Sequence, residues 1–228
     1  MTVAVLADAH IGGPGGAPGP LLSQLRDLDP DAHDRLIVLG DLFQAWVGFP
    51  RFETPEVVEL TEAFADLRRR GIAVEYVEGN RDFFLRGSPY ENAFDRVGLE
   101  TSFHAGDRRF LAVHGDGLDE GDVQYRVWRA VSKSAASRFF MKRLPRTLAH
   151  RMVRGTERRL SETNFKHKQR IPREAVTAYA EGRLAEGFDV LLLGHFHEPQ
   201  RWEVEGGEVR LLDAWFRSRR IETFGDGT

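Results

Sequence analysis

Five short apolar runs in this sequence are each followed by side chains that commonly bind metal ions. These side chains are carboxylates, an amide and imidazoles, and they belong to Asp8, His10, Asp41, Asn80, His114, His195 and His197. Because the carboxyl ends of strands form the ligand-binding crevice of open α/β folds, we expect these residues to meet in space although they are scattered along the chain. We interpret them as one metal centre.

The ligand types indicate which ions this centre binds and which chemistry it supports. Mixed oxygen and imidazole ligands suit Mn²⁺, Fe²⁺ or Zn²⁺ better than Ca²⁺, and the residue types alone do not choose among the three. Two such ions, held roughly 3.5 to 4 Å apart, neutralise phosphoryl oxygens and generate a nucleophile from water at neutral pH. The pattern therefore predicts hydrolysis of a phosphate ester or anhydride.

We expect the ligands to divide between two ions. Asp41 follows a buried strand in a Gly-Asp pair, and its carboxylate is the expected bridge. The other ligands divide into Asp8, His10 and His197 on one ion, and Asn80, His114 and His195 on the other. Short motifs of this kind are common in turns when taken singly, so the interpretation depends on five of them occurring together.

Other polar residues have less specific roles. Asp82 and Asp116 either fix the geometry of the ligand loops or take part in the reaction directly, and the sequence leaves both roles open. His33, His104 and His150 lie in no recognisable motif, so we expect them at the surface or in packing. We expect two of the tryptophans, Trp46 and Trp215, to be anchors in the core or in loops.

The segments that must position the ligands alternate between strand and helix. Apolar runs of strand length cover residues 3–6, 36–39, 74–77, 110–113 and 190–193. Helical spacing of apolar residues covers 56–70 and 173–186, and a glycine follows each segment. Residues 201–205 and 209–212 form a predicted β-hairpin, and residues 12–20 a Gly/Pro loop beside the first ligand pair. This order predicts an α/β sandwich.

The composition limits the class of protein. A chain of 228 residues with 41% hydrophobic residues can bury a large core. The absence of cysteine excludes disulfides, cysteine-ligated zinc and a thiol nucleophile. The N-terminal region lacks the basic and apolar segments of a signal peptide, so we expect a cytoplasmic, water-soluble protein.

Positive charge is concentrated in one segment. Between Arg126 and Arg173 the chain has fifteen Lys and Arg residues and two Glu residues, a local balance of +13 within a net charge of −3. Apolar residues recur among them, with Leu144, Leu148 and Met152 at every fourth position. Such a segment binds the phosphates of a nucleic acid, an anionic membrane or an anionic lipid. An amphipathic helical pair packed on the protein, with a solvated cationic face, fits the pattern equally.

The motifs around the ligands resemble those of the calcineurin-like metallophosphoesterases, in the order and at the spacing of that family. They are Asp8-Ala9-His10, Gly40-Asp41, Gly79-Asn80-Arg81-Asp82, His114-Gly115-Asp116 and Gly194-His195-Phe196-His197. The resemblance implies an αββα sandwich with a helical lid insertion. It places the metallophosphoesterase core in residues 1–125 and 174–228, and the basic lid in residues 126–173.

Arg81 indicates one branch of this family. Most members have histidine at this position, and the motif with arginine is similar to that of the UDP-2,3-diacylglucosamine pyrophosphohydrolases of the lipid A pathway. Ala214-Trp215 agrees with this branch, whereas Phe216-Arg217 stands where its members have a polar, glycine-containing turn. Arg81 is either an ion-pair partner of Asp82 or a bidentate phosphate clamp.

The resemblance to this branch implies a reaction and its residues. UDP-2,3-diacylglucosamine is cleaved to UMP and 2,3-diacylglucosamine 1-phosphate at two divalent ions, expected to be Mn²⁺, while the lid holds the acyl chains. The implied catalytic residues are Asp41, Asn80, Arg81 and His114. The implied substrate-binding residues are Arg81, Asp122, Asn164, His167 or Lys168, and His195, with Ser161 one position out of register.

Two other functions are compatible with the same fold. A nuclease or nucleotide phosphodiesterase would use the basic segment to bind nucleic acid, and a non-catalytic scaffold would have lost ligands, none of which is missing here. The apolar residues of the insert favour the lipid substrate, so we expect no nucleic-acid partner. We expect peripheral contact with an anionic membrane at its inner face. The sequence does not predict the oligomeric state.

Overall fold

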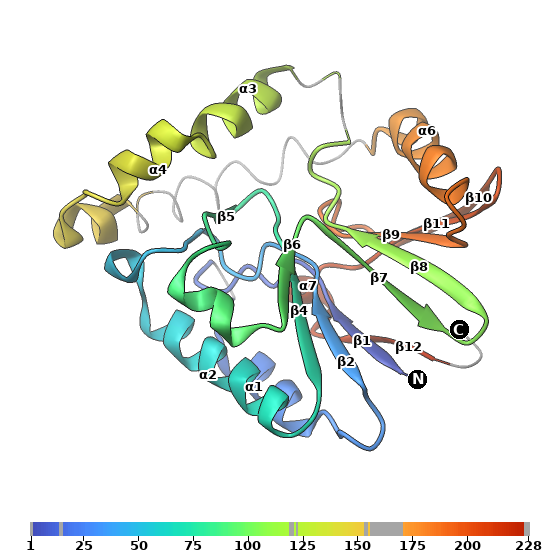
Figure 1. Cartoon of the computed structure of the whole chain (residues 1–228), viewed down its shortest axis with the longest axis horizontal. Helices are drawn as coiled ribbons and strands as arrows, with labels where there is room; N and C mark the ends of the chain where they lie inside the picture. Colours follow the sequence, from blue (N-terminus) through green and yellow to red (C-terminus); the bar gives the residue numbers. More distant parts are fainter. Residues whose placement is uncertain are drawn as a thin grey trace.

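The computed structural model describes residues 2–13, 16–118, 121, 123–152, 155 and 171–225. Two five-stranded sheets lie face to face, and helices cover their outer faces (Figure 1). The predicted α/β sandwich is therefore confirmed.

The first sheet has the strand order β12-β1-β2-β4-β6. Its strands are β1 (Val3–Leu6), β2 (Arg35–Val38), β4 (Ala73–Val77), β6 (Arg96–Gly98) and β12 (Glu222–Phe224). The strands β1, β2, β4 and β6 are parallel, and β12 pairs with β1 in the antiparallel direction. Helices α1 (Gly19–Asp27) and α2 (Pro55–Arg69) cover the outer face of this sheet.

The second sheet has the strand order β10-β11-β9-β8-β7. Its strands are β7 (Glu100–Ala105), β8 (Arg108–Val113), β9 (Val190–Leu193), β10 (Gln200–Val204) and β11 (Gly207–Leu211). The strands β8, β9 and β11 are parallel, and the two edge strands are antiparallel to their neighbours. Helix α6 (Arg173–Leu184) packs on the outer face of this sheet.

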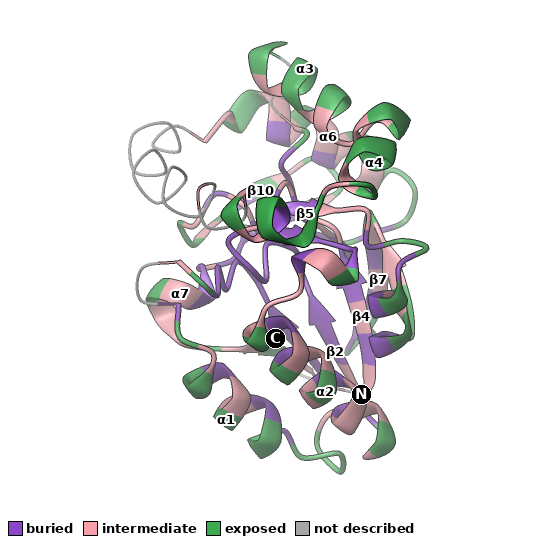
Figure 2. Cartoon of the chain, turned by 90° about the vertical axis from the view of Figure 1, so that its left-hand side faces the viewer, coloured by how far each residue is buried: buried purple, intermediate pink, exposed green. Residues whose placement is uncertain are grey.

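Most side chains of the strands that precede the ligand residues are apolar on both faces, and Glu75 of β4 is an exception. In β1, Ala4 and Leu6 pack among the side chains under α1 and α2, whereas Val3 and Val5 pack between the sheets. Figure 2 shows these strands as the buried centre of the molecule. A strand buried on both sides is a continuous apolar run, which explains why unbroken apolar runs predicted these strands to within two residues.

A lid of two helices lies over one edge of the sandwich (Figure 1). Helix α3 (Val123–Ser132) begins three residues before the predicted lid boundary, and α4 (Ala135–Met141) follows it directly. Underneath lie the short strands β3 (Trp46–Val47) and β5 (Asp82–Phe83). Residues 146–152 are also helical, and other short helices of the described residues are η1 (Pro50–Phe52), η2 (Pro89–Ala93) and α7 (Trp215–Ser218).

One predicted segment requires correction. The Gly/Pro loop predicted over residues 12–20 ends earlier, because α1 already begins at Gly19 with a proline in its first turn. Proline is tolerated at the first positions of a helix, where its missing N–H would have no helical partner. Trp46 and Trp215 are buried, as predicted for core anchors.

Candidate metal centre

The seven predicted ligand residues meet at the carboxyl ends of five strands. They follow β1 (Asp8 and His10), β2 (Asp41), β4 (Asn80), β8 (His114) and β9 (His195 and His197). Asp8 and His197 are in contact although 189 positions separate them in the chain. The crevice at the strand ends thus brings together the residues that the sequence singled out.

Five of these residues have a left-handed backbone conformation, which is uncommon outside glycine. The five are Asp8, His10, Asp41, His195 and His197, with φ between 49° and 64°. Such a conformation costs about 1–2 kcal/mol per residue, and strained residues of this kind cluster at functional sites. The local backbone is therefore adapted to the placement of these side chains.

Asp8, His10 and His197 form one group of possible ligands. Nε2 of His197 lies 3.1 Å from Oδ1 of Asp8 and 3.1 Å from Nε2 of His10. Nε2 of His10 lies 3.7 Å from the same carboxylate oxygen. Two imidazole nitrogens and one carboxylate oxygen at this separation fit a divalent cation.

Asp8, Asp41 and His114 form a second group, and Asn80 and His195 adjoin it. The three ligand atoms of the group lie within 4.8 Å of one another. Oδ1 of Asn80 lies 3.2 Å from Nε2 of His114 and 3.0 Å from Nδ1 of His195. Oδ2 of Asp41 is buried and accepts no hydrogen bond from the described residues, as expected of an atom placed to bind a cation. These residues fit a second ion.

Two aspartates lie between the two groups. Oδ2 of Asp41 is 4.0 Å from Nε2 of His10, and its Oδ1 is 3.6 Å from Nε2 of His114. Asp8 contributes to both groups. The prediction named Asp41 alone as the bridge, whereas in the structure Asp8 is the residue shared by both groups of possible ligands.

The electrostatics of the cluster favour bound cations. Burial would raise the pKa of Asp8, but His197, His114 and His10 hold this pKa well below its ordinary value. Burial would lower the pKa of His114, but Asp41 and Asp8, with Asp116, raise it above its ordinary value. The Asp8 carboxylate therefore stays ionised and attracts positive charge to the centre.

A backbone carbonyl sets the orientation of His114. Nδ1 of this ring lies 2.9 Å from the carbonyl oxygen of Leu39. Because a carbonyl oxygen only accepts hydrogen bonds, Nδ1 carries the proton and Nε2 presents its lone pair to the centre. The strand that precedes Asp41 thereby also prepares His114 for ligation.

Asp82 holds two ligand loops together. Its Oδ2 accepts hydrogen bonds from the backbone N–H groups of Asp41, at 3.1 Å, and Gly79, at 2.7 Å, and its Oδ1 accepts one from the Tyr76 hydroxyl at 2.9 Å. Burial, together with the charge of Asp41, raises the pKa of Asp82 to about 7. These contacts correspond to the first of the two roles that the sequence left open for Asp82, fixing the ligand loops.

Arg81 is buried against Asp41. Its Nε lies 3.2 Å from Oδ2 of Asp41, its backbone N–H donates to Oδ1 of Asp41 at 2.9 Å, and its Nη1 donates to the Gln44 carbonyl at 3.1 Å. The sequence considered Asp82 as the ion-pair partner, and the structure gives this place to Asp41. The guanidinium lies at the centre itself, where a phosphate clamp is needed.

Helix α3 of the lid is attached to the ligand loops. The Tyr125 hydroxyl and Nε of Arg129 both donate to Oδ2 of Asp116, at 2.6 and 2.8 Å. Nζ of Lys133 donates to the carbonyl oxygen of Gly79 at 2.7 Å. Sequence reasoning did not identify Arg129 or Lys133, since only the fold brings them to the motifs.

Phe216 and Arg217 also lie at the centre, although the sequence marked them only as a departure from the branch. The Phe216 ring is 5.4 Å from the His10 ring and 5.1 Å from the His197 ring, between centroids, and both contacts are T-shaped. Nη1 of Arg217 donates to the His197 carbonyl at 3.0 Å. The difference of these two residues from the branch is the sequence signal that could have identified them.

Some predicted residues are not assigned to the centre by the structure. Asp122, Ser161, Asn164, His167 and Lys168 fall outside the described residues. The three histidines without a motif lie away from the centre, as expected: His33 next to the Asp29 carbonyl, His104 exposed on β7, and His150 next to Arg146.

The chain belongs to the calcineurin-like phosphoesterase family, whose model matches residues 1–199. The family and the two ligand groups together define a metal-dependent hydrolase that uses divalent ions. The predicted membership of this family is confirmed.

Two similar proteins that have the same name match almost the full length of this chain. The UDP-2,3-diacylglucosamine hydrolase of Aeromonas salmonicida (strain A449) is 28% identical over 230 residues, which cover 97% of this chain and 89% of that protein. The enzyme of the same name from Aliivibrio fischeri (strain MJ11) is 27% identical over 238 residues, 99% of this chain and 95% of that protein. Among solved structures, phosphopantetheinyl hydrolase from Mycobacterium tuberculosis has a TM-score of 0.48 and 18% identity, and covers 96% of this chain and 93% of that chain.

Proposed function

We propose that the protein hydrolyses the pyrophosphate bond of UDP-2,3-diacylglucosamine to UMP and 2,3-diacylglucosamine 1-phosphate, a step of lipid A biosynthesis. The observation that carries the proposal is the cluster of seven ligand residues with Arg81 beside it and an apolar, basic lid over it. The names of the similar proteins support the choice of substrate. The proposed location is the cytoplasm, at the inner face of the membrane.

The proposed mechanism assigns binding and charge stabilisation to the side chains of the centre. Two divalent ions, proposed to be Mn²⁺, supply the charge that binds phosphoryl oxygens and acidifies the attacking water. Asp8 and Asp41 lie between the two groups and would set the spacing of the ions. Arg81 is placed to stabilise the negative charge of the departing phosphate. The side chains proposed to bind the glucosamine are Asp122, Asn164, His167, Lys168 and His195.

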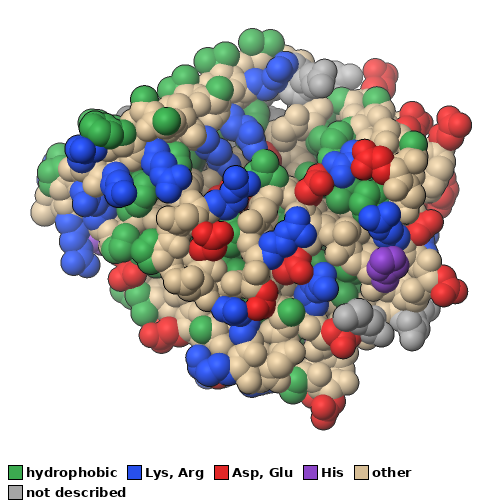
Figure 3. Space-filling model, viewed as in Figure 1, with side chains coloured by type: hydrophobic (Ala, Val, Ile, Leu, Met, Phe, Trp, Pro, Cys, Tyr) green, Lys and Arg blue, Asp and Glu red, His purple; other side chains and the backbone are tan. Residues whose placement is uncertain are grey.

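The lid is proposed to bind the acyl chains and to contact the membrane. Several of its large apolar side chains are exposed, namely Val123, Val127, Trp128, Val131, Phe139, Phe140 and Leu148. Met141, Leu144 and Met152 instead pack against Val47, Phe49 and Phe52. Figure 3 shows such side chains next to clustered Lys and Arg over α3 and α4. An apolar surface rimmed by cations suits acyl chains on one side and anionic head groups on the other. No helix in the described part of the chain is long and apolar enough to cross a membrane.

The substrate is tested with the pure protein, Mn²⁺ and three separate compounds: UDP-2,3-diacylglucosamine, UDP-glucosamine without acyl chains, and single-stranded DNA. We expect rapid release of UMP from the first compound and slow release from the second, since only the first can use the lid. Cleavage of DNA with an inert lipid substrate would instead support a nuclease, the alternative that the basic segment suggests.

A further inference from the structure

The metal centre has two different ends. At one end, Arg129 of lid helix α3 donates to Asp116, and Lys133, directly after α3, donates to Gly79. At the other end, helix α7 contacts His10 and His197. Figure 2 shows α7 and lid helix α4 on opposite sides of the molecule. A substrate bound across the two ions therefore meets the lid at one end and α7 at the other.

Helix α7 is fixed relative to the ligands of the first group. Trp215 is fully buried, and its indole N–H donates to Oε1 of Gln24 at 2.8 Å. Its backbone N–H donates to the Ala7 carbonyl at 2.8 Å, and that of Phe216 donates to the Asp8 carbonyl at 3.3 Å. The side chains that α7 presents to the centre therefore have defined positions.

Phe216 forms an apolar wall beside two of the ligands. Its ring meets the rings of His10 and His197 at interplanar angles of 61° and 79°, and these two rings are themselves 5.0 Å apart between centroids. Its side chain is only partly buried, so the ring also has an accessible surface. An aromatic wall of this kind suits a sugar or a planar base better than a phosphate.

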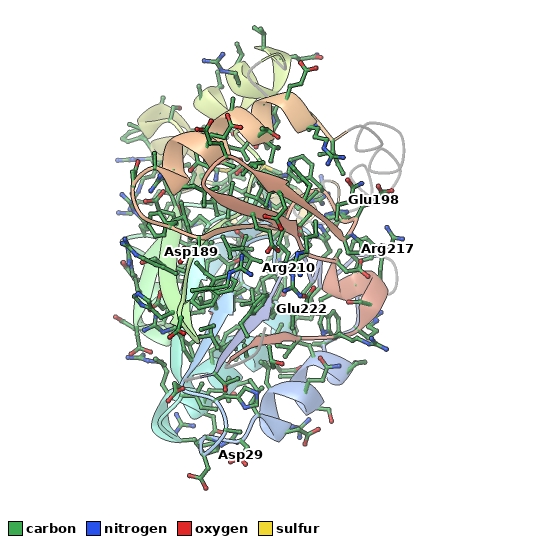
Figure 4. All side chains as sticks on the ribbon, turned by 90° about the vertical axis from the view of Figure 1, so that its right-hand side faces the viewer. Asp29, Asp189, Glu198, Arg210, Arg217 and Glu222 are labelled. Carbon is green, nitrogen blue, oxygen red and sulfur yellow. The ribbon has the colours of Figure 1, made fainter. Side chains whose placement is uncertain are left out.

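Arg217 adds a hydrogen-bond donor beyond this wall. The residue is exposed, and its Nη1 donates to the His197 carbonyl. The other N–H groups of the guanidinium make no hydrogen bond with the described residues. Figure 4 shows Arg217, a residue of α7, on the same edge of the molecule as Glu198. Arginine only donates hydrogen bonds, so the matching ligand group is an acceptor such as a carbonyl oxygen.

We propose that α7 binds the nucleoside half of the substrate, with Phe216 beside the ribose and Arg217 donating to the carbonyl oxygens of uracil. This inference rests on the proposed function, because that substrate has an acylated half and a uridine half joined by the cleaved pyrophosphate. The acylated half matches the apolar lid. The uridine half then extends to the opposite end, where the donor and the aromatic ring are located.

The test measures binding of UMP to the Mn²⁺-loaded protein by titration calorimetry. Arg217→Ala is expected to weaken UMP binding about tenfold, the effect of losing one hydrogen bond from a charged donor. The matched control is Arg220→Ala, which removes an exposed arginine of the same segment and is expected to leave UMP binding unchanged. Binding of 2,3-diacylglucosamine 1-phosphate is expected to be unchanged in both variants.

The role of Phe216 is tested with Phe216→Leu and a measurement of bound manganese by atomic emission. We expect the variant to retain as much Mn²⁺ as the wild-type protein and to bind UMP more weakly, because the wall is altered and the ligands are not. Loss of Mn²⁺ from this variant would show that Phe216 supports the ion instead, and would overturn its assignment to the nucleoside.

The results of these experiments distinguish a failure of the α7 assignment from a failure of the proposed function. A wild-type protein that releases no UMP from UDP-2,3-diacylglucosamine would reject the proposed function. If the wild-type protein releases UMP while Arg217→Ala binds UMP as tightly as the wild type, the assignment of α7 alone is overturned. Weaker binding of the lipid product, with UMP binding intact, would place the lipid at α7 and overturn it in the same way.

Discussion

The metal centre and the lid differ in how far their side chains are buried and fixed. In the centre, Asp8 and Asp41 are fully buried, and strand ends and hydrogen bonds fix the ligand loops. In the lid, Val131, Phe139 and Phe140 each have 60% or more of their surface exposed. Hydrolysis needs atoms held at defined positions, whereas flexible acyl chains need apolar area more than precise geometry. The contrast indicates that the residues of the centre determine the type of reaction, whereas those of the lid determine the type of substrate.

The largest expected effect is loss of turnover on changing the centre. Asp41→Ala removes a carboxylate from between the two ligand groups and leaves Arg81 without its ion-pair partner. We expect at least about a thousandfold lower kcat and loss of bound Mn²⁺, measured by UMP release and by atomic emission. His104→Ala is the control, since that histidine is exposed on β7. Normal turnover by the Asp41 variant would contradict the assigned centre.

Two alanine substitutions, one in the core and one in the lid, test this contrast by their effect on the free energy of unfolding. Leu192 is fully buried in β9, so Leu192→Ala is expected to lower the free energy of unfolding by about 2–5 kcal/mol. Val131 of α3 is 64% exposed, so Val131→Ala is expected to change it by less than about 0.5 kcal/mol. Urea denaturation of the folded variants measures both. A large loss from Val131→Ala would show that the lid is a packed part of the core.

Polar substitutions in the lid are expected to affect lipid binding alone. Replacing both Phe139 and Phe140 by serine removes exposed apolar area without touching the ligand loops. We expect about a tenfold higher KM for UDP-2,3-diacylglucosamine, weaker sedimentation with anionic vesicles at low salt, and unchanged binding of UMP. Vesicle binding equal to that of the wild type would argue against membrane contact through these residues.

Another small expected effect concerns an ion pair outside both regions. Arg183 donates two hydrogen bonds to Glu100, at 2.7 and 3.1 Å, and these hold the pKa of Glu100 below its ordinary value of 4.5 although burial opposes them. Glu100→Gln is expected to destabilise the fold by less than about 1 kcal/mol at pH 7, because the pair is largely solvated.

The sign of the pH dependence follows from the lowered pKa of Glu100. The contribution of the pair is complete above pH 4.5 and is lost as pH falls through the lower pKa of the folded state. Urea denaturation at pH 7 and near pH 3 should therefore give a larger difference between wild type and variant at the higher pH. A difference of equal size at both values would show that the charge of Glu100 is not responsible.

The sequence predicted those parts of the molecule that leave a local signal. Strands buried on both faces are apolar runs, and ligand side chains directly after them indicate a site at the strand ends. Strands β3 and β5 have two residues each, too few to show a period, and they were not predicted. The pairing of Arg81 with Asp41, and the contact of Phe216 with two histidines, depend on segments far apart in the chain and became visible only in the folded structure.

The left-handed backbone at five ligand positions has an evolutionary consequence. Each of these residues keeps a conformation that glycine or asparagine would adopt at lower cost, so substitutions there can relieve strain while they abolish ligation. In a copy of the gene released from selection for hydrolysis, nothing would oppose the loss of these aspartates and histidines, because backbone strain already favours it. The catalytic motifs should then decay before the apolar strands, leaving a folded descendant that no longer cleaves phosphate bonds.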